Sequence, residues 1–283
     1  MSKKQIEQLI NIALKEDIGQ QDITTNIFIP KNMICDAYIV THQKATFVGF
    51  DVVKAVFKKL DKNIKIKTFF KDGDIVKAET RIIKLRGKTR ALLTGERIAL
   101  NFLSHLSAIA TNTTEFVNAI KPYKAKILDT RKTTPGLRFL EKLAVKKAGG
   151  TNHRLNLGEM VLIKDNHHIA CPQMPVKDML TAARKKTKKL ITIEIEDLDH
   201  FKEAWLAGPD IILLDNMNLA QIKKAVAFSK ENKHKKGNPE LEVSGGVNLE
   251  NVRSYAQTGV DRISIGALTH TKKSINVSME ITQ

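Results

Sequence analysis

The stretch LEVSGGVNLENVRSYAQTGVDRISIGAL, residues 241–268, carries the pattern that decides the fold. A short apolar run ends in SGG, a helix-like segment follows over residues 249–258, and a second apolar run, RISI, ends in GA. A strand, a helix and another strand in this order form a βαβ unit whose strands are parallel. The stretch therefore predicts part of a parallel α/β sheet.

The same alternation recurs from about residue 124 onward. Four further runs rich in Ile, Leu and Val each end in polar residues, namely AKILDT (125–130), EMVLIKDN (159–166), LITIEIED (190–197) and DIILLDN (210–216). Polar residues at the carboxyl ends of successive parallel strands are typical of a TIM-like barrel, whereas a doubly wound sheet binds ligands mostly at its switch point. The polar residues that directly follow each of the six apolar runs, which we call strand exits, therefore predict a TIM-like α/β barrel.

The run ITIEIE also predicts where its carboxylates point. Glu194 and Glu196 share one face of the strand, and the isoleucines share the other. If the isoleucines meet the outer helices, both carboxylates point into the barrel mouth. A buried carboxylate needs a partner, which here could be a metal ion, a ligand hydroxyl or Lys164.

The first part of the chain has a different pattern. Strand-like runs cluster around one or two helices up to about residue 105, which predicts a small α+β domain. Apolar residues alternate with polar ones from Ile275 to Ile281, as in a half-buried strand. We therefore expect an N-terminal α+β domain at 1–105, joined by the C-terminal segment 270–283, and a catalytic barrel at 106–269.

Composition limits the classes of function. The net charge is +17, but much of it lies in KKTKK (185–189) and KENKHKK (230–236), which are typical of solvated helix ends, and aromatic residues are only 5%. This disfavours nucleic-acid binding and leaves long-range attraction of anionic metabolites. There is no apolar run of about 18 residues and no secretory signal, so we expect no membrane span. Cys35 and Cys171 form no CxxC, which favours a cytoplasmic protein.

Two glycine-containing exits predict a phosphate site. In barrels, the loops after the last two strands often bind phosphate through backbone N–H groups, and glycine allows the close approach. Ser244, Gly245 and Gly246 form one such loop, and Gly266 with Ala267 forms the other. The alternative is two ordinary strand-to-helix turns.

Cationic residues predict a ligand with more than one anionic group. Pro135 and Gly136 end the strand in ILDTRKTTPGLR (127–138) and leave Thr130, Arg131 and Lys132 beyond it. Arginine binds carboxylates and phosphates in a bidentate manner. The further candidate cations are Arg97, His153, Arg154 and Lys164. Lys164 could instead form a Schiff base, although the adjacent Asp165 favours an ion-paired lysine.

Carboxylates at two exits suggest a cation or a sugar. Glu194 and Asp215 beside phosphates could hold Mg²⁺, accept hydrogen bonds from ribose hydroxyls, or stabilise positive charge at a sugar carbon. A zinc site is disfavoured, because there is no HExxH and the adjacent His167 and His168 cannot both face one site in regular structure.

Taken in order, these motifs resemble one family, the nicotinate-nucleotide pyrophosphorylases (carboxylating), also called quinolinate phosphoribosyltransferases. The resemblance covers nearly the whole chain. Its matching pieces are EDIG…DITT (16–25), TGERIALNFLSHLSAIAT (94–111), DTRKTTPGLR (129–138), EKLAVKKAGGTNHRLNLGEMVLIKDNH (141–167), IEIED (193–197), ILLDNM (212–217), SGGVNLENV (244–252) and YAQTGVDRISIGALTH (255–270).

The resemblance implies an activity and a set of roles. Such enzymes transfer phosphoribose from phosphoribosyl pyrophosphate to the ring nitrogen of quinolinate, with loss of the 2-carboxylate as CO₂, in NAD biosynthesis. By similarity, the quinolinate site would comprise Thr130, Arg131, Lys132, His153, Arg154 and the partner subunit's Arg97. The phosphoribosyl pyrophosphate site would comprise Lys164, His167, Glu194, Asp215, Ser244 to Gly246, and Ile265 to Ala267. The catalytic residues implied are Lys132, Lys164, Glu194 and Asp215, with Mg²⁺ near the two carboxylates.

The family fold is an incomplete seven-stranded α/β barrel with an N-terminal open sandwich, assembled as a homodimer. The chain departs from the family at GQQDITT, where glycine usually precedes the aspartate, and at THTKKS, where serine more often follows the histidine. Alternatives remain: a related phosphoribosyltransferase-like protein associated with molybdenum transport, a Schiff-base aldolase using Lys164, and a basic nucleic-acid binder.

Overall fold

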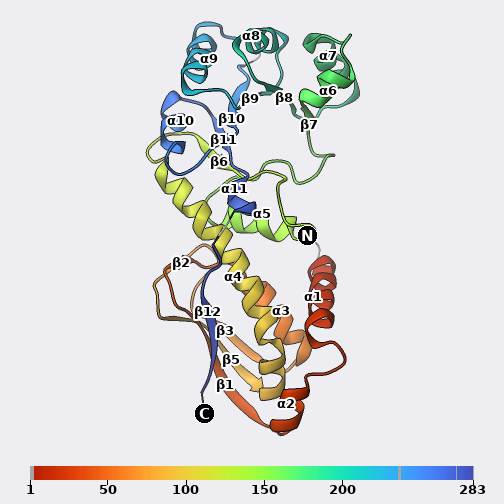
Figure 1. The fold of residues 1–283 in the computed structure, drawn as a ribbon, viewed down its shortest axis with the longest axis vertical. Helices are drawn as coiled ribbons and strands as arrows, with labels where there is room; N and C mark the ends of the chain where they lie inside the picture. The colour runs from red at the N-terminus through yellow and green to blue at the C-terminus, as the bar shows by residue number, and fades with distance from the viewer. Residues whose placement is uncertain (1–2, 235–236, 272, 283) are drawn as a thin grey trace. The chain divides into compact units, whose positions relative to one another are not determined.

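The computed structural model describes residues 3–234, 237–271 and 273–282, which form two compact units (Figure 1). Unit 1 comprises residues 1–114, 134–149 and 271–283, and unit 2 comprises residues 115–133 and 150–270. Segment 134–149 thus belongs to unit 1, although it lies within the range expected for the barrel. Lys235 and Lys236 of the tract KENKHKK lie outside the described residues.

Unit 1 is built on a four-stranded antiparallel sheet. Its order is β12 (Val277–Thr282), β1 (Ile34–Thr41), β5 (Thr80–Lys88) and β3 (Lys65–Thr68). In β1, Ala37 and Ile39 are fully buried while Asp36 and Tyr38 are half-buried on the other face, as expected for period-two alternation. The short strands β2 (Ala45–Thr46) and β4 (Ile75–Val76) form a separate pair.

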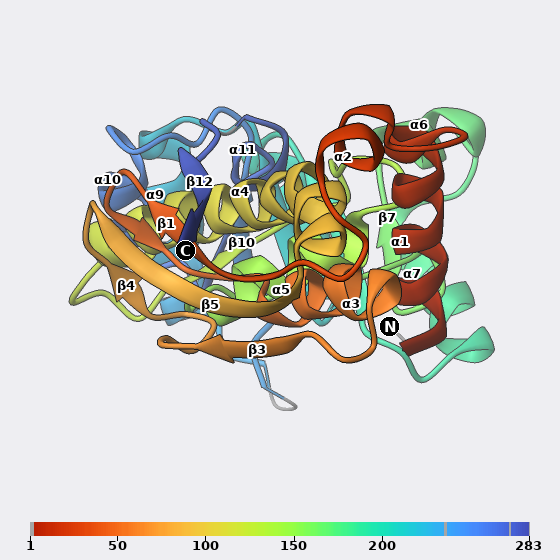
Figure 2. The same ribbon diagram turned by 90° about the horizontal axis from the view of Figure 1, so that it is seen from below.

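Helices cover one face of this sheet (Figure 2). They are α1 (Lys3–Ile18), α3 (Phe50–Leu60) and α4 (Thr89–Ala119), whose first part belongs to unit 1. Their buried side chains, including Ile10, Phe57 and Leu103, share one core with Ile39 and Leu85 of the strands. The core forms because each helix presents an apolar stripe to the apolar face of the sheet.

Two short helices complete unit 1: α2 (Ile23–Phe28) and α5 (Arg138–Lys147). Asp22 is the N-cap of α2, and its Oδ1 accepts a hydrogen bond of 3.0 Å from the backbone N–H of Thr25. The motif DITT therefore starts a helix here, and the glutamine that precedes it in this chain does not prevent the cap.

Unit 2 contains a parallel six-stranded sheet, which confirms the predicted α/β class. The order is β6 (Lys126–Leu128), β11 (Arg262–Ser264), β10 (Glu240–Ser244), β9 (Ile211–Asp215), β8 (Ile191–Ile195) and β7 (Val161–Ile163). Thr151 extends the sheet beyond β6 through a single parallel bridge to Leu128. Within the described ranges no ladder joins Thr151 to β7, so closure of a barrel is not seen.

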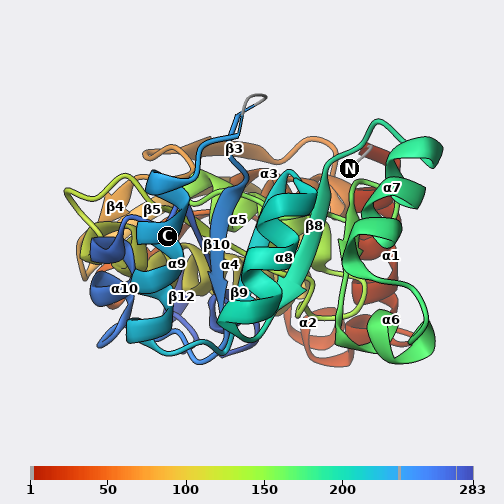
Figure 3. The same cartoon turned by 90° about the horizontal axis from the view of Figure 1, so that it is seen from above.

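The helices of unit 2 follow its strands. They are α6 (Asp165–Ala170), α7 (Val176–Lys186), α8 (Leu198–Ala207), α9 (Leu219–Glu231), α10 (Val252–Thr258) and α11 (Ala267–His270). Figure 3 shows α7, α8 and α9 beside the strands β8 to β10. The isoleucines of β8 are all buried, and Phe201 and Trp205 of α8 pack with Phe228 of α9. The helix expected from residue 249 begins later, because Asn248 accepts the backbone N–H groups of Glu250 and Asn251 in a turn.

Helix α4 is the longest in the described part of the chain, yet none of the helices described there is long and apolar enough to cross a membrane.

A buried carboxylate ties α5 to α4 within unit 1. Glu141 has no exposed surface; its Oε1 lies 2.8 Å from His105 Nε2, and its Oε2 accepts the backbone N–H of Thr134 at 3.2 Å. Burial raises the pKa of Glu141, but the bonds from His105 and Thr134 outweigh it, so the pKa lies below its usual range. The folded state therefore favours the ionised form.

We expect Glu141→Ala to lower the free energy of unfolding by about 3 kcal/mol, because it leaves buried donors unpaired. A carboxyl whose pKa is depressed on folding stabilises the protein fully above its ordinary pKa, and this contribution is lost as the pH falls through the lowered value. Urea titrations at neutral and acidic pH should show the difference from wild type shrinking with acidity. A constant difference would contradict an ionised Glu141.

Candidate active site

One cavity of about 660 Å³ lies at the carboxyl ends of the strands of unit 2. Lys164 follows β7, Glu194 lies near the end of β8, and Asp215 ends β9. Every predicted site residue of unit 2 lines this cavity. They are Thr130, Arg131, Lys132, His153, Arg154, Lys164, His167, Glu194, Asp215, Ser244, Gly245, Gly246, Ile265, Gly266 and Ala267.

Arg97 is the one predicted site residue that belongs to unit 1. It lies on α4 and lines a smaller cavity of about 370 Å³ together with Asn101, Ser104 and Asn276. Its predicted role in the site of a partner subunit stays a prediction.

The loop after β6 brings cations into the cavity. Thr130 Oγ1 accepts the backbone N–H of Lys132 at 3.0 Å, which turns the chain directly after the strand. The Nε of Arg131 is buried and has no hydrogen-bond partner among the described residues. Arg154 donates from Nη1 to the carbonyl of Met160 at 3.2 Å. Burial, followed by repulsion from Arg131, lowers the pKa of Arg154.

Two neighbouring guanidinium groups in one cavity repel each other and favour an anionic ligand between them. An acceptor on that ligand would also satisfy the buried Nε of Arg131, whose desolvation is otherwise uncompensated. The arrangement therefore suits a carboxylate or phosphate that arginine can bind at two points.

The glycine loop after β10 has the backbone that only glycine adopts easily. Gly245 has φ +93° and Gly246 has φ +60°. A Cβ on Gly245 would lie 2.7 Å from Asn216 Cγ and 2.9 Å from the backbone N of Asn216, so this position has no room for a side chain.

Gly266, after β11, is also close-packed. A Cβ there would lie 3.0 Å from Lys132 Cδ and 3.1 Å from His270 Nε2. The backbone N–H of Ile265 donates to the carbonyl of Leu128 at 2.9 Å. This amide is therefore engaged with the backbone of Leu128, although Ile265 lines the cavity.

Lys164 and Glu194 form an ion pair inside the cavity. Lys164 Nζ lies 2.8 Å from Glu194 Oε2, and the glutamate side chain is only 10% exposed. The backbone N–H of Lys164 donates to His167 Nδ1 at 2.9 Å, so His167 also caps α6. A lysine ammonium is a compact point charge that is suited to binding phosphate oxygens.

Only one of the two glutamates expected at the main cavity lines it, namely Glu194. Glu196 lines a neighbouring cavity of about 240 Å³ with Asp165, His168 and His200, and Glu194 lines this cavity too. Glu196 lies just beyond the last residue of β8, so the strand alternation no longer governs its direction. Within the residues described, no three His, Cys, Asp or Glu side chains are placed to hold a metal ion together. A Mg²⁺ ion here would therefore depend on ligand phosphates and water for most of its ligands.

Sequence reasoning missed Glu242, which lies at the base of the cavity. Its side chain is fully buried, and its Oε2 accepts Arg262 Nε at 2.7 Å. Its Oε1 accepts the hydroxyl of Ser264 and lies 3.4 Å from His153 Nε2. Burial raises the pKa of Glu242, but His153, Arg262 and Ser264 more than offset this and hold the pKa below its usual range. The strand alternation could have predicted this residue, because Glu242 lies between Leu241 and Val243 as Glu194 lies between isoleucines.

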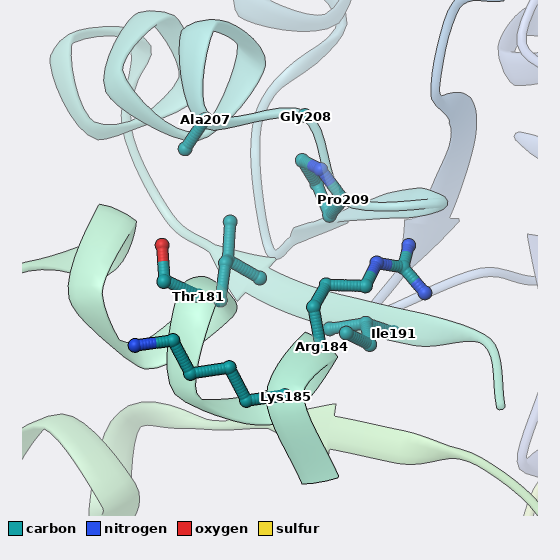
Figure 4. Close-up of a pocket in the computed structure, with 8 residues that line it drawn as sticks. Thr181, Arg184, Lys185, Ile191, Ala207, Gly208 and Pro209 are labelled. Atoms are coloured by element: carbon teal, nitrogen blue, oxygen red, sulfur yellow. The ribbon is translucent and has the colours of Figure 1, made fainter. Parts of the chain in front are cut away.

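A second cavity, of about 330 Å³, lies at the other end of β8 (Figure 4). Arg184 and Lys185 of α7 line it together with Gly208 after α8. Arg184 is already paired, because its Nη2 lies 2.5 Å from Asp210 Oδ2. This end of a parallel sheet usually serves stability, so we assign the functional site to the larger cavity.

Fold and cavity place this protein among the α/β proteins whose candidate ligand site lies at the carboxyl ends of parallel strands. Two family models match the chain: "Quinolinate phosphoribosyl transferase, N-terminal domain" over residues 22–107 and "Quinolinate phosphoribosyl transferase, C-terminal domain" over residues 109–280. The chain belongs to the quinolinate phosphoribosyl transferase family.

Individual relatives agree over the full length. The chain is 39% identical to a probable nicotinate-nucleotide pyrophosphorylase [carboxylating] of Bacillus subtilis, over 100% of this chain and 95% of the relative. The solved nicotinate-nucleotide pyrophosphorylase from Francisella tularensis superposes with a TM-score of 0.93 at 36% identity, covering 100% of this chain and 98% of that one. The enzyme from Ehrlichia chaffeensis gives a TM-score of 0.91 at 38% identity, covering 100% and 99%.

Proposed function

We propose that this protein transfers phosphoribose from phosphoribosyl pyrophosphate to the ring nitrogen of quinolinate, releasing pyrophosphate and CO₂ and forming nicotinate mononucleotide for NAD synthesis. The observation that carries the proposal is the pair of adjacent guanidiniums, Arg131 and Arg154, in the cavity that also holds the glycine loop. A ligand with several anionic groups, such as quinolinate, would bind to the two guanidiniums. A phosphate, such as the 5-phosphate of phosphoribosyl pyrophosphate, would bind to the glycine loop. Membership of the family supports both.

The loop after β6 and Arg154 would together form the part of the cavity that binds quinolinate, here called the quinolinate end. Arg131 and Arg154 would bind the two carboxylates, with Thr130 and Lys132 beside them. When the ring nitrogen gains the ribosyl carbon it becomes cationic, which stabilises the electron pair left on the ring as CO₂ departs. A proton from water then takes the place of the lost carboxylate at that carbon. Lys132 is the candidate for stabilising charge during that step.

The phosphoribosyl end would be formed by the remaining strand exits. Ser244 to Gly246 and Gly266 to Ala267 would bind the 5-phosphate, while Lys164 and His167 would bind the pyrophosphate. Glu194 and Asp215 would stabilise positive charge at the sugar carbon and accept ribose hydroxyls. Mg²⁺ suits this oxygen-rich set and would neutralise pyrophosphate as the leaving group.

The test is one assay. Purified protein, Mg²⁺, phosphoribosyl pyrophosphate and carboxyl-labelled quinolinate should release labelled CO₂ only when all are present, and nicotinate in a parallel reaction should remain unused. Nicotinate consumption, or release without phosphoribosyl pyrophosphate, would contradict the proposal. Borohydride trapping of a substrate on Lys164 would instead favour a Schiff-base aldolase.

We expect Glu194→Gln to lower kcat about a hundredfold with little change in either KM, because its charge acts mainly as positive charge develops on the sugar. Steady-state kinetics with each substrate varied in turn gives the three constants. Glu196→Gln is the matched control, since Glu196 lies two residues further along the same segment and does not line the main cavity. Equal losses in the two variants would contradict the role of Glu194.

The active form is proposed to be a homodimer in the cytoplasm. Helix α2 and the residues after it expose apolar side chains that a partner subunit could cover, namely Ile23 (62%), Ile27 (67%), Phe28 (74%) and Ile34 (59%). Cys35 and Cys171 are both free, as suits a reducing compartment. A monomer in sedimentation equilibrium at assay concentrations would contradict the dimer.

A further inference from the structure

The ring of His153 is held by the protein at both nitrogens. Nδ1 accepts the backbone N–H of Arg154 at 2.8 Å, and Nε2 lies 3.4 Å from Glu242 Oε1. The imidazole is only 7% exposed, and the backbone N–H of His153 donates to Asp129 Oδ1 at 2.9 Å. This differs from a histidine that presents a free N–H to a ligand.

These contacts determine which of the two ring nitrogens carries the proton. A nitrogen that accepts a hydrogen bond carries no proton, so Nδ1 is bare and the single proton lies on Nε2, facing the carboxylate. A proton on Nδ1 would oppose the Arg154 N–H directly.

Glu242 is suited to this task because it receives three donors. Its two oxygens accept from Arg262 Nε, from the hydroxyl of Ser264 and from His153 Nε2. Glutamate satisfies all three, whereas a glutamine amide has one accepting oxygen and would place an NH₂ group against a donor. Glu240 binds the other side of Arg262, at 3.0 Å, and is 42% exposed.

We propose that Glu242 is a positioning residue that holds His153 as a neutral Nε2–H imidazole, which in turn fixes the backbone of Arg154 and directs its guanidinium into the cavity. This rests on the proposed function for the identity of the ligand, but the state of the ring does not. His153 then supports the quinolinate end of the cavity by fixing the backbone of Arg154.

The ring state is measured directly by NMR. In protein labelled with ¹⁵N at the histidine rings, the resonance absent from His153→Gln identifies His153. We expect the two unequal nitrogen shifts of a ring that carries its proton on Nε2, as the hydrogen bond from Arg154 to Nδ1 requires. A doubly protonated ring or an Nδ1–H tautomer overturns the proposal, whether or not the protein converts quinolinate.

The positioning role is measured by kinetics. Glu242→Gln should raise the KM for quinolinate about tenfold, with kcat and the KM for phosphoribosyl pyrophosphate changed by less than about threefold, as expected for one misplaced charged contact. Glu240→Gln, which weakens the same arginine without touching His153, should leave all three constants near wild type. Equal effects of the two variants, or a similar rise in both KM values, overturn the proposal.

Two isosteres of His153 test the same idea if Glu242→Gln does not fold. Asn places an oxygen near the Nδ1 position and can still accept the Arg154 N–H, whereas Gln reaches towards Glu242 and cannot. His153→Asn should therefore retain a KM for quinolinate several-fold closer to wild type than His153→Gln. Equal losses would indicate a direct cationic contact with the ligand and would overturn the proposal.

Discussion

Replacing Arg131 by alanine should raise the KM for quinolinate about a hundredfold and leave the KM for phosphoribosyl pyrophosphate within about threefold, because it removes a two-point contact to a carboxylate. The buried Nε of Arg131 has no hydrogen-bond partner in the described part of the chain, which indicates that the ligand supplies its acceptor. Steady-state kinetics and calorimetric titration with quinolinate measure the two effects. Removing one of two repelling guanidiniums should at the same time leave stability unchanged or slightly raised.

Arg81→Ala is the control for this variant, since Arg81 is an exposed arginine of unit 1 that stacks on Tyr38. Its kinetics should match wild type. A rise in the KM for phosphoribosyl pyrophosphate as large as that for quinolinate would contradict the assignment of Arg131 to the quinolinate end.

A mixing experiment then tests the homodimer and Arg97 together. If Arg97 completes the site of the partner subunit, Arg97→Ala and Arg131→Ala are each nearly inactive alone at quinolinate concentrations near the wild-type KM. After dissociation and remixing in equal amounts, half of the dimers are mixed and each carries one intact site, so activity should recover to about a quarter of wild type. No recovery would contradict sharing of the site between subunits.

The strand exits could be predicted from the sequence because the geometry of a parallel sheet places them together. Lys164, Glu194 and Asp215 lie far apart in the chain, yet each follows an apolar run, and carboxyl ends of parallel strands share one edge. The alternation within β8 also predicted that Glu194 lies at the candidate site, and Glu194 lines the cavity.

What could not be predicted depends on pairing between distant residues. Glu242 meets Arg262 because β10 and β11 pair in the register Glu242↔Arg262, and it meets His153 through a loop whose path no local pattern specifies. Thr151 contributes one bridge instead of a strand, which is too short to leave a periodic signal. Glu196 lies past the end of β8, where alternation stops predicting direction.

Gly245→Ala should lower kcat/KM for phosphoribosyl pyrophosphate roughly a hundredfold, since small displacements of a binding loop cost about this much. The new methyl group has two costs. The backbone at φ +93° is strained for alanine, and the Cβ would lie within 3 Å of Asn216 Cγ and of its backbone N. Asn216 adjoins Asp215 and donates from Nδ2 to Asp215 Oδ2 at 2.8 Å, so the displacement should reach the ribose-binding carboxylate as well as the phosphate loop.

Gly259→Ala is the control that separates the effect of backbone strain on stability from the effect of the new methyl group on the phosphate loop. Gly259 has φ +95°, almost the same backbone, but it ends α10 outside the cavity, and its Cβ would meet Val226 at an ordinary 3.6 Å. Both variants should lose about 1 kcal/mol of stability from the left-handed backbone, while only Gly245→Ala should weaken phosphoribosyl pyrophosphate binding. If the two lose activity equally, the loop after β10 acts through the stability of the fold, and the phosphate must bind at another strand exit.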